Sequence, residues 1–240
     1  MSVLVWIAGA LVLVLVVGFV RSVARQSGAL THVARGIAAL RALAATHPRL
    51  SPATDQETAA QRAGEVEEEM VVGGLRPLGA YWEYLPDGSR AGITRWFADE
   101  AGTTFGWYGL TAAGPAQFLV SEVEGQGWAA TYRGPEAPQL ASPETVRMEH
   151  LTWEEGLASA LARHHDACRS LGAPPARLVP VSDAEGAQNL FRRLKAHAAA
   201  WRETLAYEEL LERDARSVLG GRFDELGALI LQEVRTLEGR

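Results

Sequence analysis

The sequence predicts an α+β protein with an N-terminal transmembrane helix, a juxtamembrane helical hairpin and a sheet packed by C-terminal helices. Three observations lead to this prediction. Residues 3–20 form an uncharged apolar stretch, residues 80–132 hold short aromatic and β-branched runs between turn residues, and residues 153–237 repeat apolar side chains at helical spacing. We therefore expect a transmembrane anchor at 1–20, a helical hairpin at 21–71, an antiparallel sheet of about five strands with one helix at 72–180, and C-terminal helices at 181–240.

The apolar stretch at residues 3–20 is long enough to cross a bilayer. About 18 residues of helix rise about 27 Å, and the hydrocarbon layer is roughly 30 Å thick. A cleaved signal peptide is one alternative, but the stretch lacks a preceding basic region and a following small-residue cleavage site. A buried core helix is the other, which the absence of a polar face disfavours. The residues expected to hold the anchor in the bilayer and at its surface are Val3, Trp6, Phe19, Val20, Arg21 and Arg25.

Charge and cysteine content predict the compartment. All five arginines of residues 1–50 follow the apolar stretch, and no acidic residue precedes Asp55. By the positive-inside rule, this places the C-terminal domain of a single-pass inner-membrane protein in the cytoplasm. The single cysteine, Cys168, excludes an internal disulfide, which agrees with a reducing compartment. One lysine among many arginines, with abundant alanine and glycine, indicates a GC-rich bacterial genome.

Two helices of opposite charge are expected after the anchor. The first runs from about Arg21 to His47, and the second is opened by Ser51-Pro52 and continues to about Met70. Together they would form a helical hairpin with one basic and one acidic arm. A homo-oligomeric coiled coil is the alternative, because the first helix carries an apolar stripe at alternating three- and four-residue spacing. That stripe consists of Leu30, Val33, Ile37, Leu40 and Ala44, of which the first four would form the oligomer contact.

Five short strands are expected after the Gly73-Gly74 boundary. The runs are rich in aromatic and β-branched residues, and turn-forming clusters such as PDGS and EGQG separate them. Because short turns connect antiparallel neighbours, the sheet should be a meander. The strands are expected at residues 80–85, 93–98, 103–108, 117–123 and 128–132, followed by an irregular connection at 134–143.

Three helices are expected in the C-terminal part of the chain. The first opens with a capping box at Thr152 and Glu155 and ends before Gly172. The second opens at Ser182 and continues to about Val218. The last presents apolar residues at helical spacing over residues 223–237.

The densest group of metal-capable side chains lies in the first of these helices. His164 and Cys168 are four residues apart and share a helix face, so that His150 or His197 could complete a metal site. The same two residues belong to the apolar stripe of the helix, which favours a core histidine beside a core cysteine. No nucleotide-binding, zinc-protease or hydrolase motif occurs. We therefore expect no catalytic residue, metal or cofactor, and keep as the alternative function a small-ligand or metal-binding domain around His150, His164 and Cys168 that could be hydrolytic.

Four of the five expected strands carry one tryptophan each, namely Trp82, Trp96, Trp107 and Trp128. Aromatic side chains on one face of a sheet could line a groove for a ligand or a partner. Packing between the sheet and its helices is the more ordinary use of such residues.

The order of these features resembles that of a known class of proteins. An aromatic strand meander, a proline-rich connection and a helix spelled Leu157-x-x-x-Leu161-x-x-His164-His165 follow an N-terminal membrane segment. Over roughly residues 75–205 this arrangement is similar to a class of membrane-anchored bacterial proteins with a cytoplasmic α+β domain and no established activity. The resemblance implies an architecture and assigns no catalytic residue.

These observations favour a non-enzymatic function. The chain carries a net charge of −6 although its first part is basic, so the body is acidic, which argues against nucleic acid as a partner. We expect a single-pass, membrane-anchored cytoplasmic interaction or adaptor protein. Its expected partners are the lipid bilayer and a membrane or cytoplasmic protein.

Overall fold

The computed structural model describes two compact units of this chain. The helical unit contains a helix at residues 28–42 and the C-terminal helices from Ala206 to Arg240, and the sheet unit extends from Leu43 to Pro138 and from Ser142 to Leu205. Within the described ranges, no helix combines the length and apolar character that a membrane span requires. The predicted anchor, with Val3, Trp6, Phe19, Val20, Arg21 and Arg25, lies outside the described residues. Those residues are 28–42, 44, 49–55, 57, 64–84, 88–111, 114–135, 140–172, 181 and 183–240.

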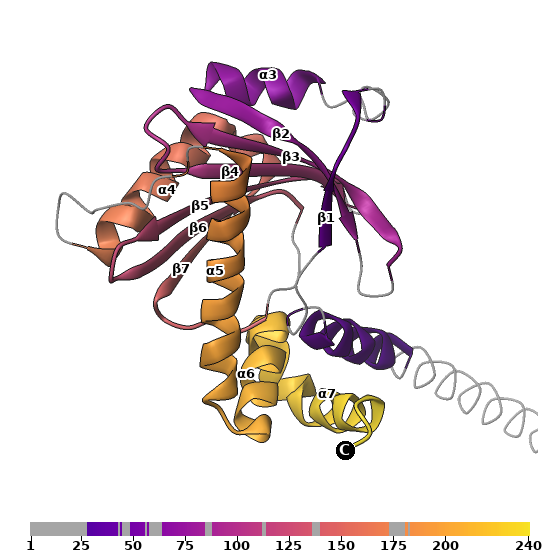
Figure 1. Ribbon diagram of the computed structural model, residues 1–240. Coiled ribbons are helices and arrows are strands. Elements are labelled where there is room, and N and C mark those ends of the chain that lie inside the picture. The colour runs from indigo at the N-terminus through magenta and orange to yellow at the C-terminus, as the bar shows by residue number, and fades with distance from the viewer. Residues whose placement is uncertain are drawn as a thin grey trace, which may run out of the picture. The chain divides into compact units, whose positions relative to one another are not determined.

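The sheet has seven strands in sequential order (Figure 1). All neighbours pair antiparallel except β6 and β7, which are parallel. Strands β2 to β6 overlap the five predicted runs, so the meander is confirmed. The strands are β1 (Arg49–Pro52), β2 (Leu75–Tyr84), β3 (Arg90–Asp99), β4 (Phe105–Thr111), β5 (Gly114–Val123), β6 (Gly127–Arg133) and β7 (Val146–Leu151).

The predicted strand number and the purely antiparallel pairing are wrong at the two edges of the sheet. Strand β1 was expected to be the start of a helix at Ser51-Pro52, but Pro52 is compatible with an edge strand, where its missing N–H costs no ladder bond. Strand β7 lies in a segment that was expected to precede a helix. It pairs with β6 only after a connection through residues 134–145, and local turn patterns do not reveal such a parallel pairing.

Helices cover both faces of the sheet. Helices α3 (Gly64–Val72) and α4 (Leu157–Leu171) pack on a core that includes Phe97 and Leu119, whereas α5 (Ala184–Glu203) packs on a core that includes Trp96 and Val120. Successive side chains of a strand point to opposite faces, which explains why adjacent residues belong to different cores. Accordingly, α4 and α5 lie on opposite sides of the sheet (Figure 1).

The two caps predicted for the sheet unit form at or next to the predicted residues. The backbone N–H of Thr152 donates to the Glu155 carboxylate (2.9 Å), which shapes the short helix η1 (Trp153–Glu155) before α4. Helix α5 is capped by Asp183, which accepts from the Gly186 N–H (2.8 Å), one residue after the predicted Ser182. It ends at Glu203, earlier than expected, and the Thr204 hydroxyl donates to the carbonyl of the preceding turn.

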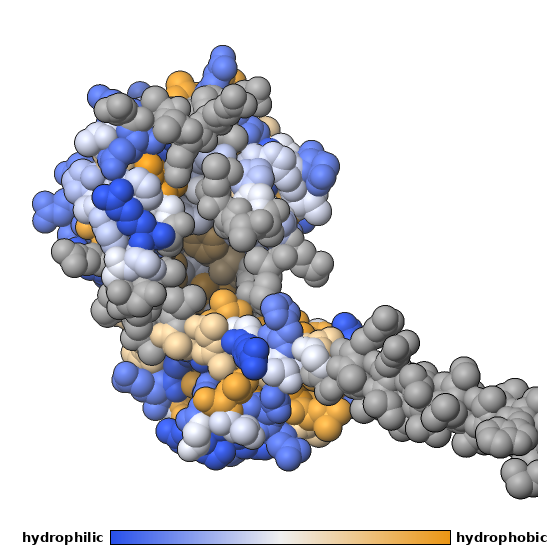
Figure 2. Space-filling model, turned by 90° about the vertical axis from the view of Figure 1, so that its right-hand side faces the viewer, coloured by the Kyte–Doolittle hydropathy of each residue, from blue (hydrophilic) through white to orange (hydrophobic). Residues whose placement is uncertain are grey.

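The helical unit joins the first described helix to the end of the chain. Helix 28–42 packs with α6 (Tyr207–Leu219) and α7 (Phe223–Leu237), which the short helix η2 (Gly220–Arg222) connects. Apolar surface is visible on this unit (Figure 2), and α7 contributes the exposed Leu229 and Leu237 to the molecular surface. Its buried core consists of Ala34, Ile37, Leu211, Ala215, Ile230 and Val234.

This packing differs from the predicted hairpin. Residues 49–52 form β1, and α3 packs on the sheet. The apolar stripe of helix 28–42 instead meets α6 and α7, where Ile37 is completely buried and Leu30 and Val33 are partly buried. Oligomerisation through Leu30, Val33, Ile37 and Leu40 stays a prediction.

Candidate functional site

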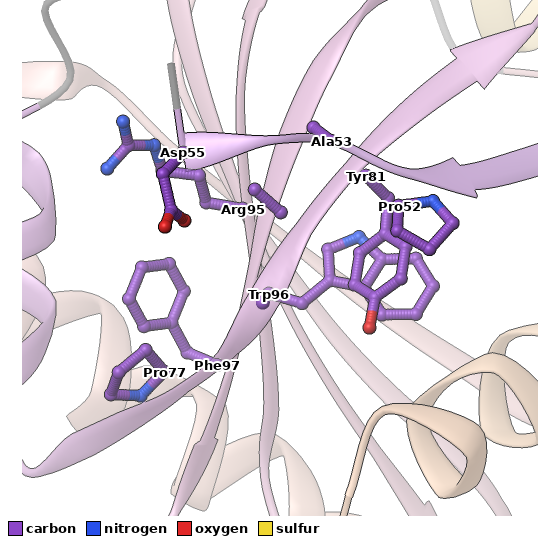
Figure 3. Close-up of a pocket in the computed structure, with 10 residues that line it drawn as sticks. Pro52, Ala53, Asp55, Pro77, Tyr81, Arg95, Trp96 and Phe97 are labelled. Atoms are coloured by element: carbon purple, nitrogen blue, oxygen red, sulfur yellow. The ribbon is translucent and has the colours of Figure 1, made fainter. Parts of the chain in front are cut away.

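A cavity of about 320 Å³ lies beside β2 and β3 in the sheet unit (Figure 3). Strand β1 ends at Pro52, and the next residue, Ala53, donates its N–H to the Ala80 carbonyl (2.9 Å) before the chain leaves the sheet. The cavity is lined by Pro52, Ala53 and Asp55 after this departure, by Pro77 and residues 79–81 of β2, and by residues 95–97 of β3.

A β-bulge in β2 shapes this cavity. The register of β2 and β3 shifts between Pro77 and Gly79, so that Leu78 is an extra residue opposite the Phe97–Trp96 step. Gly79 has a φ of 141°, a conformation that a residue with a Cβ rarely adopts. A Cβ at this position would also lie 3.2 Å from the Tyr81 hydroxyl oxygen. The bulge therefore depends on glycine.

The lining combines opposite charges with apolar rings. Arg95 is only 9 % exposed, and its burial lowers the pKa of the guanidinium, whereas Asp55 is exposed. Figure 3 shows Asp55, Arg95, Phe97 and Pro77 on one side of the β2 ribbon, with Tyr81, Trp96 and Pro52 on the other. The volume is at the lower end of the roughly 300–1,000 Å³ that small-molecule sites occupy.

Neither Arg95 nor Asp55 is among the site residues that the sequence predicts. A signal was present in β3, where Ile93, Arg95 and Phe97 alternate and therefore share one face. An arginine between two core positions indicates a buried cation that has a partner, because Arg is almost never fully buried unless it is paired. No comparable signal marks Asp55, since its place in the cavity depends on where the chain leaves β1.

His164 is a structural residue of the sheet unit. It is fully buried, and both ring nitrogens have hydroxyl partners, Ser121 Oγ at Nε2 (2.9 Å) and Thr131 Oγ1 at Nδ1 (3.0 Å). The Ser121 hydroxyl donates its only hydrogen to the Thr103 carbonyl (2.7 Å), so the His164 Nε2–H donates to Ser121 and Nδ1 accepts from Thr131. Burial lowers the pKa of His164 to about 3. The imidazole is therefore neutral at physiological pH.

Of the other residues proposed for the metal site, only Cys168 lies near His164 among the described residues, because both side chains bond to Ser121. Cys168 is buried among Val123, Ala129 and Ala167, and burial raises the pKa of its thiol. His150 is exposed on β7, where its ring contacts Tyr132 on the sheet face opposite α4 (centroids 4.9 Å apart).

His197 bonds to Thr145 through Nε2 (2.7 Å). Among the described residues, no three His, Cys, Asp or Glu side chains gather as a metal ion would require.

The four tryptophans do not form one open face. Trp96, Trp107 and Trp128 belong to the core under α5, and Trp96 and Trp128 are buried there. The Trp96 indole N–H donates to the Thr94 hydroxyl (3.1 Å). Trp82 lies outside this core, half-buried beneath the Arg90 guanidinium, 4.3 Å from its ring centroid. Three of the four indoles therefore serve sheet–helix packing.

The cavity beside Arg95 is thus the candidate site. It combines a buried cation, an exposed carboxylate and aromatic walls on a strand pair with a bulge. Comparison of the chain with protein-family models, curated proteins and solved structures gives no match.

Proposed function

We propose that this protein is a membrane-anchored interaction protein of the bacterial inner membrane, whose sheet unit binds a partner on the cytoplasmic side. One observation supports this proposal most. Helix 28–42, which follows the predicted anchor, is attached to the C-terminal helices. Arg41 donates to Asp214 (2.6 Å) and to Glu238 (2.8 Å), and the Asp214 side chain is fully buried. Removing one member of a buried ion pair leaves an uncompensated charge, so such a pair holds its helices together.

This attachment supports an adaptor role for a physical reason. A folded junction connects the anchor to the C-terminal helices more closely than a flexible linker would. Anchoring in a bilayer raises the effective concentration of a binding module for a membrane partner. The cavity beside Arg95 supplies a place for such binding. The proposal assigns no catalytic residue.

Photo-crosslinking in native membranes tests this function. A photoreactive amino acid replaces the exposed Asp55 at the cavity, and a control chain carries it at the exposed Gln232 of α7. Three versions are compared: the full chain, residues 28–240 alone, and residues 28–240 behind an unrelated single-span anchor.

We expect one discrete protein adduct from position 55 in both anchored versions, a weaker adduct without an anchor, and none of that mass from position 232. Equal adduct yield with and without an anchor contradicts the role of anchoring. The absence of any protein adduct from position 55 contradicts the interaction role.

A further inference from the structure

We infer that the protein forms a two-fold symmetric dimer, in which the outer edge of strand β7 pairs antiparallel with β7 of a second copy. Met148 lies at the two-fold axis, and Arg147 of each copy faces Glu149 of the other. The inference goes beyond the proposed function, because it concerns a different surface from the cavity. It follows from the backbone of this edge, from its charges and from the register that both require.

Strand β7 forms one end of the seven-stranded sheet, and β1 forms the other (Figure 1). Among the described residues, no strand pairs with the outer side of β7. Strand β1 has four residues and ends in proline, whereas β7 has six residues, no proline and no register shift. Proteins usually blunt an open edge with proline, a bulge, a short strand or charged side chains. Of these, β7 has only the charges, and their order decides what it can pair with.

The hydrogen bonds to β6 show which backbone groups of β7 point outward. At one end, the Trp128 N–H donates to the Thr145 carbonyl (2.7 Å). At the other end, the Gly134 N–H donates to the Leu151 carbonyl (3.1 Å), and the parallel register between these bonds is uninterrupted. In a regular parallel pair, every second residue of a strand bonds to its neighbour. The residues of β7 that instead present their N–H and C=O groups to the open edge are 146, 148 and 150.

One antiparallel register gives each of these residues an outward residue of the second copy as its partner. Met148 then lies opposite Met148, and Val146 of each copy lies opposite His150 of the other. Residues in such positions form the hydrogen-bonded pairs of an antiparallel ladder. The Val146 N–H already donates to the Pro143 carbonyl (2.9 Å), so in this pair the Val146 carbonyl accepts from the His150 N–H of the second copy.

The charges of β7 favour the same register. Arg147 and Glu149 share one face of the strand with Leu151, which is buried in the core under α4. Arg147 is exposed, Glu149 is partly exposed, and within the described ranges neither has an ion pair. In the register centred on Met148, each Arg147 lies directly opposite Glu149 of the second copy, which gives two equivalent attractive pairs. A register centred on residue 147 or 149 instead places two arginines or two glutamates opposite each other.

The size of the contact favours association in a membrane. Two six-residue strands form a smaller interface than most stable soluble dimers have. Two chains held in one bilayer meet at a raised effective concentration, which compensates for a small interface. The dimer is therefore tested with the full chain in membranes.

Cysteine crosslinking tests the contact at the two-fold axis. Residues of a hydrogen-bonded antiparallel pair have Cα atoms about 5.5 Å apart, within the range that a disulfide spans. Met148→Cys should therefore give a disulfide-linked dimer under mild oxidation. The matched control is Glu144→Cys, at an exposed position just before the same strand, where the two copies of the residue would lie roughly 27 Å apart. It should form the dimer at least about tenfold more slowly, and the wild type, whose Cys168 is buried, should form none.

Charge exchange tests the register without an added cysteine. Chains carry a monomeric donor or acceptor fluorescent protein after Arg240, and energy transfer in membranes measures their association. Arg147→Glu alone and Glu149→Arg alone should each associate at least about tenfold more weakly than the wild type, because each places like charges opposite each other twice. A mixture of the two variants should associate as strongly as the wild type, because each glutamate then faces an arginine of the other chain. A misfolded variant could not be rescued in this way.

The inference is overturned if Met148→Cys forms no dimer or forms it no faster than Glu144→Cys does. Unchanged association of either charge variant, or a mixture that associates no better than its components, also overturns it. If circular dichroism shows that Met148→Cys does not fold, the energy-transfer result decides. A dimer without any adduct from position 55 in the photo-crosslinking experiment would contradict the proposed function and leave this inference standing.

Discussion

At the level of single residues, His164 makes the stability of the sheet unit depend on pH. Its neutral ring is held by Ser121 and Thr131, and burial lowers its pKa to about 3 from 6.5. As the pH falls below 6.5, the unfolded chain binds a proton that the folded chain does not. The free energy of unfolding should therefore fall by up to about 1.4 kcal/mol per pH unit on this account, until the pH approaches the folded pKa.

Urea unfolding between pH 7 and pH 4 measures this effect. His164→Gln is expected to be less stable than the wild type at pH 7 and to lack this part of the pH dependence. His32→Gln is the control, because His32 is exposed on helix 28–42 in the other unit and should leave the slope unchanged. An equally steep loss of stability in wild type and His164→Gln would show that another group titrates.

Residue spacing placed His164 and Cys168 on the inward face of their helix, and the structure confirms that both are buried. Residue spacing could not predict the hydroxyl partners of His164, because Ser121 and Thr131 are 43 and 33 residues away in the chain. The position of Arg95 in the cavity likewise depends on the bulge at Gly79 and on the course of the chain after β1. Residue types are local information, whereas their partners depend on the fold.

At the level of elements, Glu69 connects α3 to the sheet and to α4. Its carboxylate accepts two bonds from Arg133 Nη1 (3.0 and 3.1 Å) and one from the Leu157 N–H (3.0 Å) at the first residue of α4. The Arg133 side chain is 4 % exposed, donates to the Gln117 side chain and the Trp153 carbonyl, and stacks on the Trp153 ring. Glu69 therefore balances a buried charge and satisfies a helix N-terminus.

Glu69→Gln keeps the shape of the side chain but should weaken both its pairing with Arg133 and its bond to the Leu157 N–H. Because Glu69 is one-third exposed, we expect a loss of about 1–3 kcal/mol, below the range for fully buried pairs. Glu68→Gln, at an exposed position of the same helix, should change stability by less than about 0.5 kcal/mol. Chemical denaturation followed by tryptophan fluorescence measures both values. Similar losses in the two variants would contradict a special role for Glu69.

The elements that the sequence predicted are those with local signals. Helical periodicity and the capping box located α4, and turn clusters located the antiparallel neighbours β2 to β6. The parallel pair of β6 and β7 requires a contact across an irregular connection, and β1 is only four residues long and ends in proline. Neither strand has a periodic pattern long enough to be distinguished from its surroundings.

At the level of the whole molecule, the helical unit is built from two segments far apart in the sequence, helix 28–42 and the C-terminal helices. The apolar stripe of helix 28–42 indicated a packing partner, but spacing alone could not place that partner in α6 and α7. Arg41 and Asp214, which join them, are 173 residues apart. This separation explains why a nearby hairpin partner was predicted instead. Local charge complementarity is a weak guide, because exposed pairs contribute only about 0–1 kcal/mol.

Asp214→Asn should loosen the helical unit without affecting the sheet unit. The substitution preserves the shape of a fully buried side chain. Among the described residues, it leaves the Arg41 guanidinium, which is 10 % exposed, with Glu238 as an acidic partner. We expect a loss of about 3 kcal/mol in the helical unit, at the lower end of the range for breaking a buried pair, because Glu238 still compensates part of the charge.

Hydrogen exchange with mass spectrometry measures the two units separately. Amides of residues 28–42 and of α6 should exchange faster in Asp214→Asn, by roughly a hundredfold if exchange follows the opening of this unit, while amides of β3 to β6 keep their rates. Asp224→Asn is the control, because Asp224 is exposed at the start of α7 and lies 3.9 Å from Arg216. Faster exchange in both units would indicate that they unfold together, and unchanged exchange in helix 28–42 would show that the Arg41 pair does not hold that helix in place.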